Sequence, residues 1–566
     1  MSWTPEAAPW WARAVVYQVY PRSFADSDGD GIGDLPGILG RLDHLSAPGV
    51  DVVWVSPIYT SPQDDNGYDI SDYQAVDPVF GTLGDLDDLV RELHARGMKL
   101  VMDLVVNHTS DEHPWFVESR DPASAKRDWY WWRPGRADAP GGAPNKWESA
   151  FGGPAWAYDE RSGAWYLHIF SPKQPDLDWE NREVRQAVHS MMRWWVDRGI
   201  DGFRMDVINL ISKDVALPDG PPLFPDRELA PPFGVLNGPR LHEFLAEMNR
   251  EVGLTDQHLL TVGEMPGSTV ELARDVTDPS RRELDMVFTF EHVSLDQVPG
   301  LDKFALQDVP LPVLKANLAT WQDGLADVGW NSLYWDNHDQ PRAVSRFGDD
   351  SPEHRVVSAK TLATVLHLHR GTPYVYQGEE LGMTNAGFTR VEDYADLESL
   401  NWARDALARG TSRADVVHAL AVKSRDNART PMQWDAGPHG GFTTGTPWLP
   451  TNPNRTVVNA TAAVADPDSV FHHYRRLIAL RHTEQVVVDG RFALLLPDDL
   501  QVWAFTRTLG DAVLLVLANC SSQAATVGAA SLPDLAGSEV LLPTHGESWS
   551  LILRPWESRI HRLRPS

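Results

Sequence analysis

Ionisable side chains follow four apolar runs of the sequence at the point where each run ends. The residues are His108, Arg204 with Asp206, Glu264, and His338 with Asp339. A barrel of parallel strands directs the carboxyl ends of its strands into one pocket, so these groups are expected to meet there. A single Asp at a strand end is most often a helix cap or a loop carboxylate, but four such strand ends are poorly explained by capping.

Three carboxyl groups in one pocket, Asp206, Glu264 and Asp339, suit the hydrolysis of a glycosidic bond. That reaction needs one carboxylate as nucleophile and one carboxylic acid to protonate the leaving oxygen. Burial and crowding separate the pKa values of such a pair. The same residue types could also bind a metal ion or perform aspartic-protease chemistry. Surroundings rich in Trp and Tyr favour a sugar over a metal ion, and the barrel spacing does not suit a two-Asp dyad.

Eight short runs rich in Val, Ile and Tyr are the strands expected to position these groups. They cover residues 14–20, 50–55, 99–105, 202–205, 259–262, 286–290, 332–335 and 373–376. Amphipathic helix patterns alternate with them, for example at 83–96, 182–198 and 355–368. Strands that alternate with helices predict a parallel sheet, and eight repeats predict an α/β protein built on a (β/α)8 TIM barrel.

The uneven spacing of these strands predicts additional domains. A long stretch dense in Trp, Gly and Pro separates the third strand from the fourth, and we interpret residues 108–178 as an inserted domain B. Residues 1–107 and 179–485 are then the two parts of the barrel, with an irregular subdomain at about 377–453. Short strand patterns between turns predict a C-terminal antiparallel β-sandwich domain over 486–566.

Carboxylates alternate with glycines in the segment Asp26-Ser-Asp28-Gly-Asp30-Gly-Ile32-Gly-Asp34. Alternating oxygen ligands with glycines between them allow a tight loop to wrap a hard cation, as in the first half of an EF-hand loop. We expect the four Asp side chains and the backbone carbonyl of Ile32 to hold a structural Ca²⁺. Mg²⁺ is the second candidate, and no organic cofactor is expected. The alternative is a solvated acidic turn without an ion.

The composition argues against two classes of partner. The chain has 50 basic and 79 acidic residues and a formal net charge of −29. Nucleic-acid binding needs clustered Lys and Arg, and an anionic membrane surface also attracts basic segments, so neither partner is expected. The chain contains 23 Trp residues, whose flat apolar faces suit both core packing and contact with sugars.

The single cysteine, Cys520, excludes an internal disulfide and lies in an apolar run, which indicates a buried structural thiol. A chain without disulfides is typical of a reducing compartment. The N-terminal residues have neither the basic nor the apolar region of a secretory signal. No stretch approaches the ~18–20 apolar residues of a membrane span. We therefore expect a cytoplasmic protein that is a monomer or a weak homo-oligomer.

These motifs, in this order, resemble the signature regions of the α-amylase superfamily, glycoside hydrolase family 13. Further matches are the segments 64–72, 174–178 and 424–434. Together they resemble the oligo-1,6-glucosidase and α-glucosidase branch over about residues 10–480. The resemblance implies an enzyme with small-molecule α-glucoside substrates. A non-catalytic relative or a carbohydrate-binding protein would leave the paired carboxyl groups unexplained.

The resemblance implies catalytic roles for three residues. Asp206 is the nucleophile that forms a β-glucosyl-enzyme, and Glu264 is the general acid that later acts as the base. Asp339 holds the 2- and 3-hydroxyls of the sugar. Arg204 stands two residues before the nucleophile, which places both side chains on one face of a strand, and it would keep Asp206 ionised.

Further residues would bind the substrate by the same resemblance. His108 and His338 would donate hydrogen bonds to sugar hydroxyls, although each could instead be a histidine satisfied within the core. Phe170 is placed with them among the substrate-binding residues.

Asp65 and Arg425 would grip the terminal glucose and close the far end of the pocket, and Tyr68 would stack on the same ring. This pair implies an exo-acting glucosidase and not an endo-acting amylase. Its alternative is a surface ion pair, which contributes little.

Val207, directly after the nucleophile, goes with a preference for α-1,6 linkages in this branch, whereas Ala or Thr goes with α-1,4. A stiff β-branched side chain would shape the site for the leaving sugar. Asp178 departs from the Asn that is usual in these glucosidases, so the linkage stays open. The alternatives are an α-1,4-glucosidase, a trehalose-6-phosphate hydrolase and a sucrose-converting enzyme, and any retaining member could also transfer glucose to an acceptor.

Overall fold

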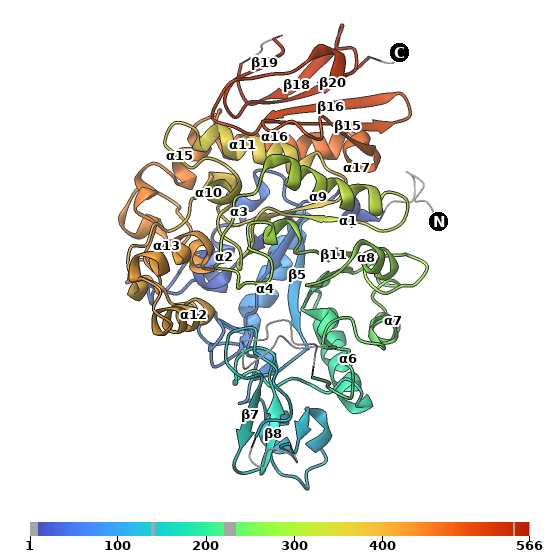
Figure 1. Cartoon of the computed structure of the whole chain (residues 1–566), viewed down its shortest axis with the longest axis vertical. Helices are drawn as coiled ribbons and strands as arrows, with labels where there is room; N and C mark the ends of the chain where they lie inside the picture. Colours follow the sequence, from blue (N-terminus) through green and yellow to red (C-terminus); the bar gives the residue numbers. More distant parts are fainter. Residues whose placement is uncertain (1–8, 137–141, 220–233, 547–549, 565–566) are drawn as a thin grey trace.

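The computed structural model describes residues 9–136, 142–219, 234–546 and 550–564. Residues 1–8 lie outside this described part. They include most of the N-terminal residues in which we expected no secretory signal. Figure 1 shows a C-terminal sheet at one end of the long axis, a barrel in the middle, and the strands β7 and β8 at the other end.

Eight parallel strands form the barrel, as the sequence predicted. They are β1 (Val16–Val19), β2 (Val52–Val55), β5 (Lys99–Val105), β9 (Gly202–Asp206), β10 (Leu260–Glu264), β11 (Met286–Phe288), β12 (Ser332–Leu333) and β13 (Thr372–Tyr376). Neighbours follow chain order from β1 to β11, and β13 pairs with both β12 and β1. A parallel bridge between Val287 and Asn331 joins the two edges, so the sheet is nearly closed.

Burial on both faces explains why these strands are apolar runs without alternation. Every residue of β2, β9 and β10 is buried. Strands covered on both sides need continuous apolar sequence, rich in β-branched residues. Two carboxyl groups stand at carboxyl ends, since Asp206 is the last residue of β9 and Glu264 is the last residue of β10, while Arg204 and Asp103 are charges inside β9 and β5. The fold thus delivers the two carboxyl groups from neighbouring strands to one end of the barrel.

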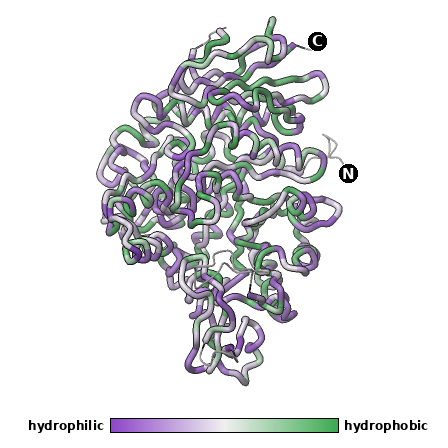
Figure 2. The backbone as a smooth tube through the Cα atoms, viewed as in Figure 1, coloured by the Kyte–Doolittle hydropathy of each residue, from purple (hydrophilic) through white to green (hydrophobic). Residues whose placement is uncertain are grey.

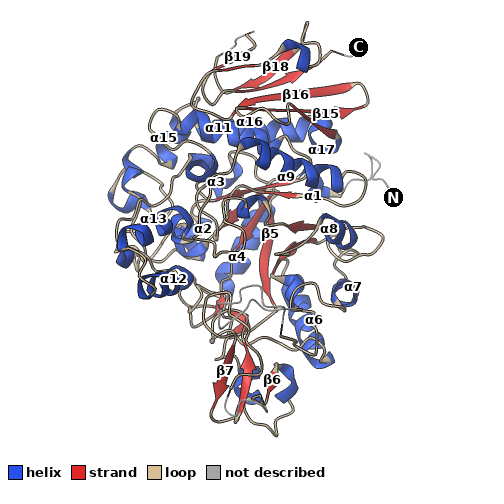
Figure 3. Cartoon of the chain, in the orientation of Figure 1, coloured by secondary structure: helices blue, strands red, loops and turns tan. Residues whose placement is uncertain are grey.

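Helices surround the barrel (Figure 3). The longer ones are α4 (Leu83–Ala95), α6 (Arg182–Asp197), α7 (Leu241–Val252), α8 (Val270–Val276), α9 (Leu311–Gly324), α11 (Arg355–His367) and α16 (Val470–Thr483). The shorter ones include α1 (Trp10–Arg13), α2 (Leu35–Leu39), α3 (Leu42–Ser46), α10 (Ala343–Phe347), α15 (Ala460–Ala465) and α17 (Gln485–Asp489). Helix α4 shows why these segments are helical. Thr82 and Asp85 form a capping box at its start, and Leu86, Leu89 and Leu93 are buried on one face.

The segment between β5 and β9 holds the short helix α5 (Pro114–Ser119) and a three-stranded antiparallel sheet. The sheet has the order β6 (Trp132–Arg133), β8 (Ala164–Leu167) and β7 (Trp156–Asp159). Five Trp residues between positions 108 and 178 are buried: Trp129, Trp131, Trp132, Trp147 and Trp156. The Trp-rich composition therefore builds a local core, while the domain boundaries at 108 and 178 stay a prediction.

The stretch at 377–453, expected to be irregular, contains two regular helices. They are α12 (Leu397–Ala408) and α13 (Arg413–Lys423), followed by the short α14 (Asp426–Arg429). Ala403, Ala406, Val416 and Leu420 pack between α12 and α13. Their apolar positions are largely alanines, so the amphipathic pattern is weak, and the expectation of irregular structure holds only outside these helices.

The C-terminal strands form an antiparallel sheet, as predicted. Its order is β14 (Arg491–Leu495), β15 (Val502–Leu509), β16 (Ala512–Asn519), β20 (Ser558–Arg562) and β18 (Glu539–Pro543). A two-stranded sheet of β17 (Ala525–Thr526) and β19 (Ile552–Leu553) shares an apolar cluster with it. Figure 2 shows hydrophobic and hydrophilic residues interspersed along the coloured parts of the chain.

Lys315 on α9 fastens the C-terminal sheet to the barrel. Its Nζ atom donates to the backbone carbonyls of Leu496, Asp499 and Val502 at 2.6, 2.7 and 3.0 Å. Burial raises the pKa of the nearby Cys520 thiol to about 12, which leaves it protonated and structural.

Candidate active site

A cavity of about 1040 Å³ collects most of the predicted site residues in one place. Its lining includes Asp65, Tyr68, His108, Phe170, Asp206, Val207, Glu264, Asp339 and Arg425. Two predicted residues, Arg204 and His338, do not line the cavity. Their side chains are almost fully buried and contact residues that do.

Arg204 holds three carboxyl groups together beside the cavity. Its Nη1 atom donates to Oδ1 of Asp206 and to Oδ1 of Asp103, each at 2.7 Å, and Nη2 lies 2.7 Å from Oε1 of Glu264. Arg204 and Asp206 stand two residues apart on β9, so both side chains project from one face of the strand. A guanidinium is planar and binds several carboxylates at once, which fixes Asp206 and Glu264 relative to each other.

Burial raises the pKa of both carboxyl groups, but not equally. The pKa of Glu264 rises to about 8, because burial outweighs the attraction of Arg204 and the charge on Asp206 adds to the effect. The pKa of Asp206 rises to about 6, where burial is again opposed by Arg204. Between these two values Glu264 holds a proton and Asp206 is ionised. One group can then donate a proton while the other attacks as a nucleophile.

Val207, the residue after Asp206, has a left-handed backbone with φ 35° and ψ 42°. A β-branched residue rarely adopts this conformation. With this geometry its N–H donates to Oε2 of Glu264 at 3.1 Å, and its side chain lines the cavity. Val207 therefore links the end of β9 to Glu264 and forms part of the wall beside the two carboxyl groups.

Asp339 lies among three basic side chains. Its Oδ1 atom accepts hydrogen bonds from Arg429 at 2.6 Å and Arg425 at 3.4 Å, and Oδ2 lies 3.2 Å from Nε2 of His338. Burial alone would raise its pKa, but His338, Arg425 and Arg429 hold the pKa well below its usual range. Asp339 is therefore a fixed negative charge that accepts hydrogen bonds and does not supply a proton.

Asp65 and Arg425 form a buried ion pair in the cavity wall. Nη2 of Arg425 lies 3.0 Å from Oδ1 of Asp65 and 2.6 Å from Oδ1 of Asp396. Gln174 donates to the other oxygen of Asp65 at 3.3 Å. Burial raises the pKa of Asp65 to about 6 despite Arg425. Because both side chains of the pair are less than 10% exposed, this is not a solvated surface contact.

Tyr68 and His338 stack with ring centroids 5.3 Å apart and a 6° angle between their planes. Oη of Tyr68 lies 2.6 Å from Nε2 of His338, and Nδ1 of His338 lies 2.8 Å from Nε2 of Gln18. Burial lowers the pKa of His338 to about 3, so its ring is neutral at physiological pH. In this arrangement His338 holds the Tyr68 ring in the cavity wall.

His108 and Phe170 lie next to each other in the wall, with ring centroids 5.2 Å apart. Nε2 of His108 is 3.2 Å from the carbonyl oxygen of Tyr68 and 3.2 Å from Nε2 of Gln174. Burial lowers the pKa of His108 to about 4. The ring is thus neutral and faces polar partners.

Residues 18–490 match the family described as the alpha amylase catalytic domain. The chain belongs to the α-amylase family of glycoside hydrolases. This confirms the predicted resemblance to glycoside hydrolase family 13.

Several characterised members of the α-amylase family resemble the chain over nearly its full length. An oligo-1,6-glucosidase of Parageobacillus thermoglucosidasius is 53% identical over 565 residues, covering 98% of this chain and 99% of the relative. A trehalose-6-phosphate hydrolase of Bacillus subtilis (strain 168) is 48% identical, covering 99% of both chains. The crystal structure of isomaltulose synthase from Klebsiella sp. LX3 has a TM-score of 0.92 at 39% identity, covering 98% of this chain and 100% of that one.

The outer part of the cavity in this α-amylase-family chain carries charged side chains. They are Glu148, Asp302, Lys303, Glu398, Asp405 and Arg409. Lys303 forms an ion pair with Glu398, and Phe304 stacks on Trp402 with ring centroids 4.2 Å apart. Among the described residues, Trp402 of α12 lines the cavity, whereas the Trp residues of the inserted segment do not. The many described Trp residues of the inserted segment therefore serve to pack its core and do not line the cavity.

Three of the four predicted metal-binding aspartates converge near the start of the chain. Carboxylate oxygens of Asp26, Asp28 and Asp34 lie within 4.8 Å of one another. Asp30 is not in this group, and its carboxylate accepts the backbone N–H of Ile32 at 2.8 Å. Three hard oxygen donors on a glycine-rich loop fit Ca²⁺ or Mg²⁺. The involvement of Asp30 and of the Ile32 carbonyl stays a prediction.

Sequence reasoning assigned no role to Asp103 or Arg429, although both touch the predicted residues. Asp103 binds Arg204 and accepts a hydrogen bond from Nε1 of Trp54 at 2.8 Å. Its signal was a charge inside the otherwise apolar strand β5, which requires a buried cation as partner. Arg429, which contacts Asp339, lies in the matched segment 424–434 and could have been found there.

Proposed function

We propose that this glycoside hydrolase is a retaining, exo-acting α-glucosidase. It releases glucose from the non-reducing ends of short α-glucosides, prefers α-1,6 linkages of the isomaltose type, and transfers glucose to acceptors as a side reaction. The observation that carries the proposal is the attachment of Asp206 and Glu264 to the same guanidinium, Arg204, next to a cavity that also contains the buried Asp65–Arg425 pair.

The proposed reaction has two steps. Asp206 attacks the anomeric carbon and forms a β-glucosyl ester, while Glu264 gives its proton to the departing glycosidic oxygen. Glu264, now ionised, then takes a proton from water as the water attacks the same carbon and releases Asp206. The unequal pKa values of about 6 and about 8 provide the required protonation states at the start. Asp339 binds the 2- and 3-hydroxyls of the glucose as a permanent acceptor.

Exo action is supported by the Asp65–Arg425 pair. Both groups are buried, both line the cavity, and both offer hydrogen-bonding atoms to hydroxyls of a terminal sugar. A sugar chain that continued past this pair would have to displace a buried ion pair, which is unfavourable. Tyr68, His108 and Phe170 complete the proposed glucose site, and His338 supports the Tyr68 ring from behind the cavity wall.

The α-1,6 preference is supported by Val207, whose backbone N–H donates to Glu264 and which lines the cavity beside this proposed acid. The similarity to an oligo-1,6-glucosidase, which is 53% identical to this chain, also supports the α-1,6 preference. The α-1,4 specificity of a maltase and a sucrose-converting reaction are the alternatives.

The charges at the rim favour a neutral leaving sugar over a phosphorylated one. Among the described residues there, Glu148, Asp302, Glu398 and Asp405 are acidic, against two basic residues: Lys303, which is paired with Glu398, and the exposed Arg409. A phosphate group needs free cations, and a net acidic rim repels it. This argues against trehalose-6-phosphate as the substrate, although a hydrolase of that compound is among the relatives.

We also propose a bound metal ion, a compartment and an oligomeric state for the enzyme. The loop with Asp26, Asp28 and Asp34 holds a structural Ca²⁺, or Mg²⁺, which stabilises the loop. The enzyme acts in the cytoplasm as a monomer or weak homo-oligomer, on small substrates and not on nucleic acid. No helix in the described residues is long and apolar enough to cross a membrane.

The test is a substrate panel of isomaltose, maltose, sucrose, trehalose and trehalose-6-phosphate, with the products separated by chromatography. Isomaltose is expected to give glucose fastest, and NMR should detect the α-anomer of glucose first. Asp206→Asn should lower kcat by at least about a thousandfold, because the nucleophile is lost. Asp327→Asn, in an exposed ion pair with Arg491, is the matched control and should be normal. Near-normal turnover by Asp206→Asn would reject the mechanism.

A further inference from the structure

A hairpin in the loop between β11 and α9 forms part of the cavity wall. Gln297 and Leu306 form an antiparallel bridge, and the N–H of Gln307 donates to the carbonyl of Asp296 at 2.9 Å. We call residues 296–307 the wall hairpin. Its far end carries Asp302, Lys303 and Phe304, which line the outer cavity. Asp296 therefore stands at the base of a hairpin whose tip borders the space for the leaving group.

Two buried cations bind the carboxylate of Asp296. Arg346 donates from Nε to Oδ2 at 2.9 Å and from Nη2 to Oδ1 at 2.8 Å, which is a bidentate contact. Nζ of Lys423 donates to Oδ1 at 2.8 Å. The side chains of Arg346 and Lys423 are only 3% and 2% exposed. Such a contact is far more rigid than a surface ion pair, because neither cation has solvent to compensate for a lost partner.

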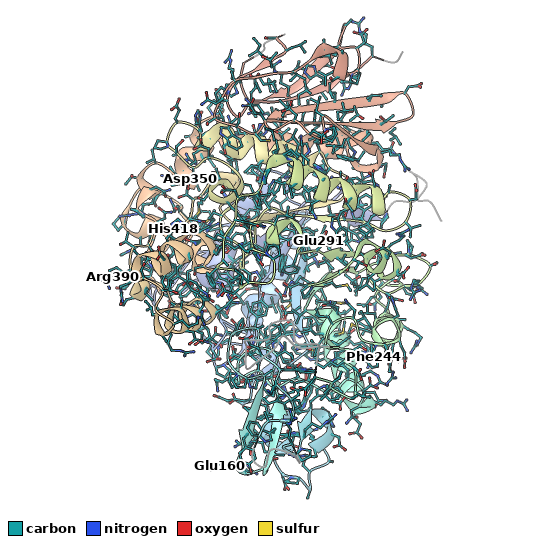
Figure 4. The ribbon with its side chains drawn as sticks, viewed as in Figure 1. Glu160, Phe244, Glu291, Asp350, Arg390 and His418 are labelled. Atoms are coloured by element: carbon teal, nitrogen blue, oxygen red, sulfur yellow. The ribbon has the colours of Figure 1, made fainter. Side chains whose placement is uncertain are left out.

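The two cations come from the elements that carry the proposed glucose site. Arg346 lies on α10 and also donates from Nη1 to Oε1 of Gln340 at 2.7 Å. Gln340 directly follows Asp339 and lines the cavity. Lys423 is the last residue of α13, two residues before Arg425. Figure 4 labels Glu291, near the start of the loop between β11 and α9, and His418 on α13.

The contacts at the hairpin tip are weaker than those at its base. Lys303 pairs with Glu398, but both side chains are about one-fifth exposed, at 23% and 19%. Phe304 stacks on Trp402 of α12. These tip contacts hold the wall against α12, where Glu398 also lies 3.7 Å from Nε of Arg425. The base contacts hold the wall against α10 and the end of α13, close to Asp339 and Arg425. The more deeply buried base thus contributes more than the tip to fixing the outer wall relative to the glucose site.

We propose that Asp296 is a positioning residue for the leaving-sugar side of the cavity: through Arg346 and Lys423 it fixes the wall hairpin relative to Asp339 and Arg425. The inference rests on the proposed glucosidase function, since it assumes that a leaving sugar occupies the outer cavity. Asp296 itself touches neither the reacting atoms nor the cavity lining.

The charge balance around Asp296 supports this role. Burial, reinforced by Arg346, lowers the pKa of Lys423 to about 7, even though Asp296 attracts its proton. Arg346 and Lys423 in turn hold the pKa of Asp296 below its usual range, against the effect of burial. Without the carboxylate, the pKa of Lys423 would fall further and Lys423 would lose its charge. The hairpin base would then lose its charged contacts with Arg346 and Lys423, and of the contacts that these two described side chains make with the loop, only the bond from Arg346 to the carbonyl of Val293 would remain.

The experiment compares two substrates of the complete enzyme that differ only in the leaving group. Isomaltose places a sugar in the outer cavity, whereas α-glucosyl fluoride releases fluoride and needs no contact there. Asp296→Asn keeps the size of the side chain and removes its charge. We expect kcat/KM for isomaltose to fall about tenfold, mainly through KM, while kcat/KM for α-glucosyl fluoride stays within about twofold. Asp256→Asn, in an exposed ion pair with Arg282, is the matched control.

A parallel fall for both substrates would overturn the proposal, because a general structural defect acts on both, and so would no change for either. Lys423→Met should also lower the ratio of kcat/KM for isomaltose to kcat/KM for α-glucosyl fluoride. The double variant, Asp296→Asn with Lys423→Met, should lower this ratio by less than the two single effects combined. If the wild type prefers another disaccharide, the linkage proposal fails, and the same comparison is made with that disaccharide. The two failures are therefore distinguishable.

Discussion

The backbone N–H of Val207 donates to Oε2 of Glu264 at 3.1 Å, while Val207 holds a left-handed backbone conformation at the end of β9. Such a conformation costs ~1–3 kcal/mol for a residue of this type and persists only when its surroundings impose it. The hydrogen bond favours the ionised carboxylate and so acts against burial, which raises the pKa of Glu264. The residue that shapes the proposed leaving-group wall thus also adjusts the proposed acid.

Replacing Val207 tests the linkage proposal. Val207→Thr keeps a β-branched side chain but exchanges a methyl group for a hydroxyl, which offers a polar contact to a differently oriented leaving sugar. We expect the ratio of kcat/KM for maltose to that for isomaltose to rise about tenfold, measured by glucose release. Val207→Ile, which stays apolar, should leave the ratio close to that of the wild type. An unchanged ratio in the Thr variant contradicts the role of this position in linkage preference.

The pH dependence of kcat/KM should be bell-shaped, with limbs near the two raised pKa values. Activity is expected to fall below about pH 6, where Asp206 becomes protonated, and above about pH 8, where Glu264 loses its proton. We would measure initial rates of isomaltose hydrolysis between pH 4.5 and pH 9.5, in steps of ~0.5 pH units and in buffers of constant ionic strength.

Glu264→Gln separates the two limbs. With α-glucosyl fluoride, whose leaving group needs no proton, glucosyl transfer to Asp206 should persist in this variant, and its alkaline limb should vanish. The acid limb should remain, because it belongs to Asp206. If the alkaline limb survives in Glu264→Gln, another group produces it and the acid assignment is wrong.

The barrel was predictable from sequence because it repeats a single physical pattern. Most of its strands are buried over nearly their whole length, as in Val52–Val55, and helices such as the amphipathic α4 alternate with them, so composition and periodicity agree. Asp206 and Glu264 stood out because a charge at the end of such a run has no packing explanation. Helices α12 and α13 were missed because three of the five buried residues that they contribute to their shared apolar cluster are alanines.

The electrostatic partners could not be predicted in the same way. The contacts of Arg204 with Asp103 and Glu264 join residues about 100 and 60 positions apart, and sequence gives no distance between side chains. The left-handed backbone of Val207 is equally hidden, since valine disfavours it and only the surrounding structure imposes it. The contacts of Asp296 with Arg346 and Lys423 depend on how α10 and α13 are placed in the fold, which the sequence does not show.

Removing divalent cations should lower the melting temperature without stopping catalysis. A cation bound by Asp26, Asp28 and Asp34 stabilises the folded state by ~2.7 kcal/mol at a hundred times its dissociation constant. We expect Ca²⁺ to raise the melting temperature of chelator-treated enzyme by a few degrees, measured by scanning calorimetry, with the 25 °C activity unchanged. Asp28→Asn should abolish this shift. Equal melting curves for wild type with and without Ca²⁺ would show that the loop is an acidic turn.

Buried neutral histidines should make the enzyme less stable in acid. Burial lowers the pKa of His367 to about 3 and that of His369 to about 4, and in the described structure neither ring nitrogen of His367 has a hydrogen-bond partner. The unfolded chain binds protons at these residues with a pKa of about 6.5, so stability is complete above that pH and is lost as the pH falls toward the folded values. At pH 5 each such residue costs about 2 kcal/mol.

The measurement that checks this acid sensitivity is the melting temperature between pH 7.5 and pH 4.5, at one scan rate. His367→Leu removes one of the buried proton acceptors while keeping an apolar side chain of similar size. Its melting temperature should fall less steeply with decreasing pH than that of the wild type. The exposed His418, replaced by Gln, is the matched control and should follow the wild-type curve. Parallel curves for His367→Leu and the wild type would mean that other groups, such as Asp339 and Asp396, whose pKa values are held below the usual range, set the acid stability.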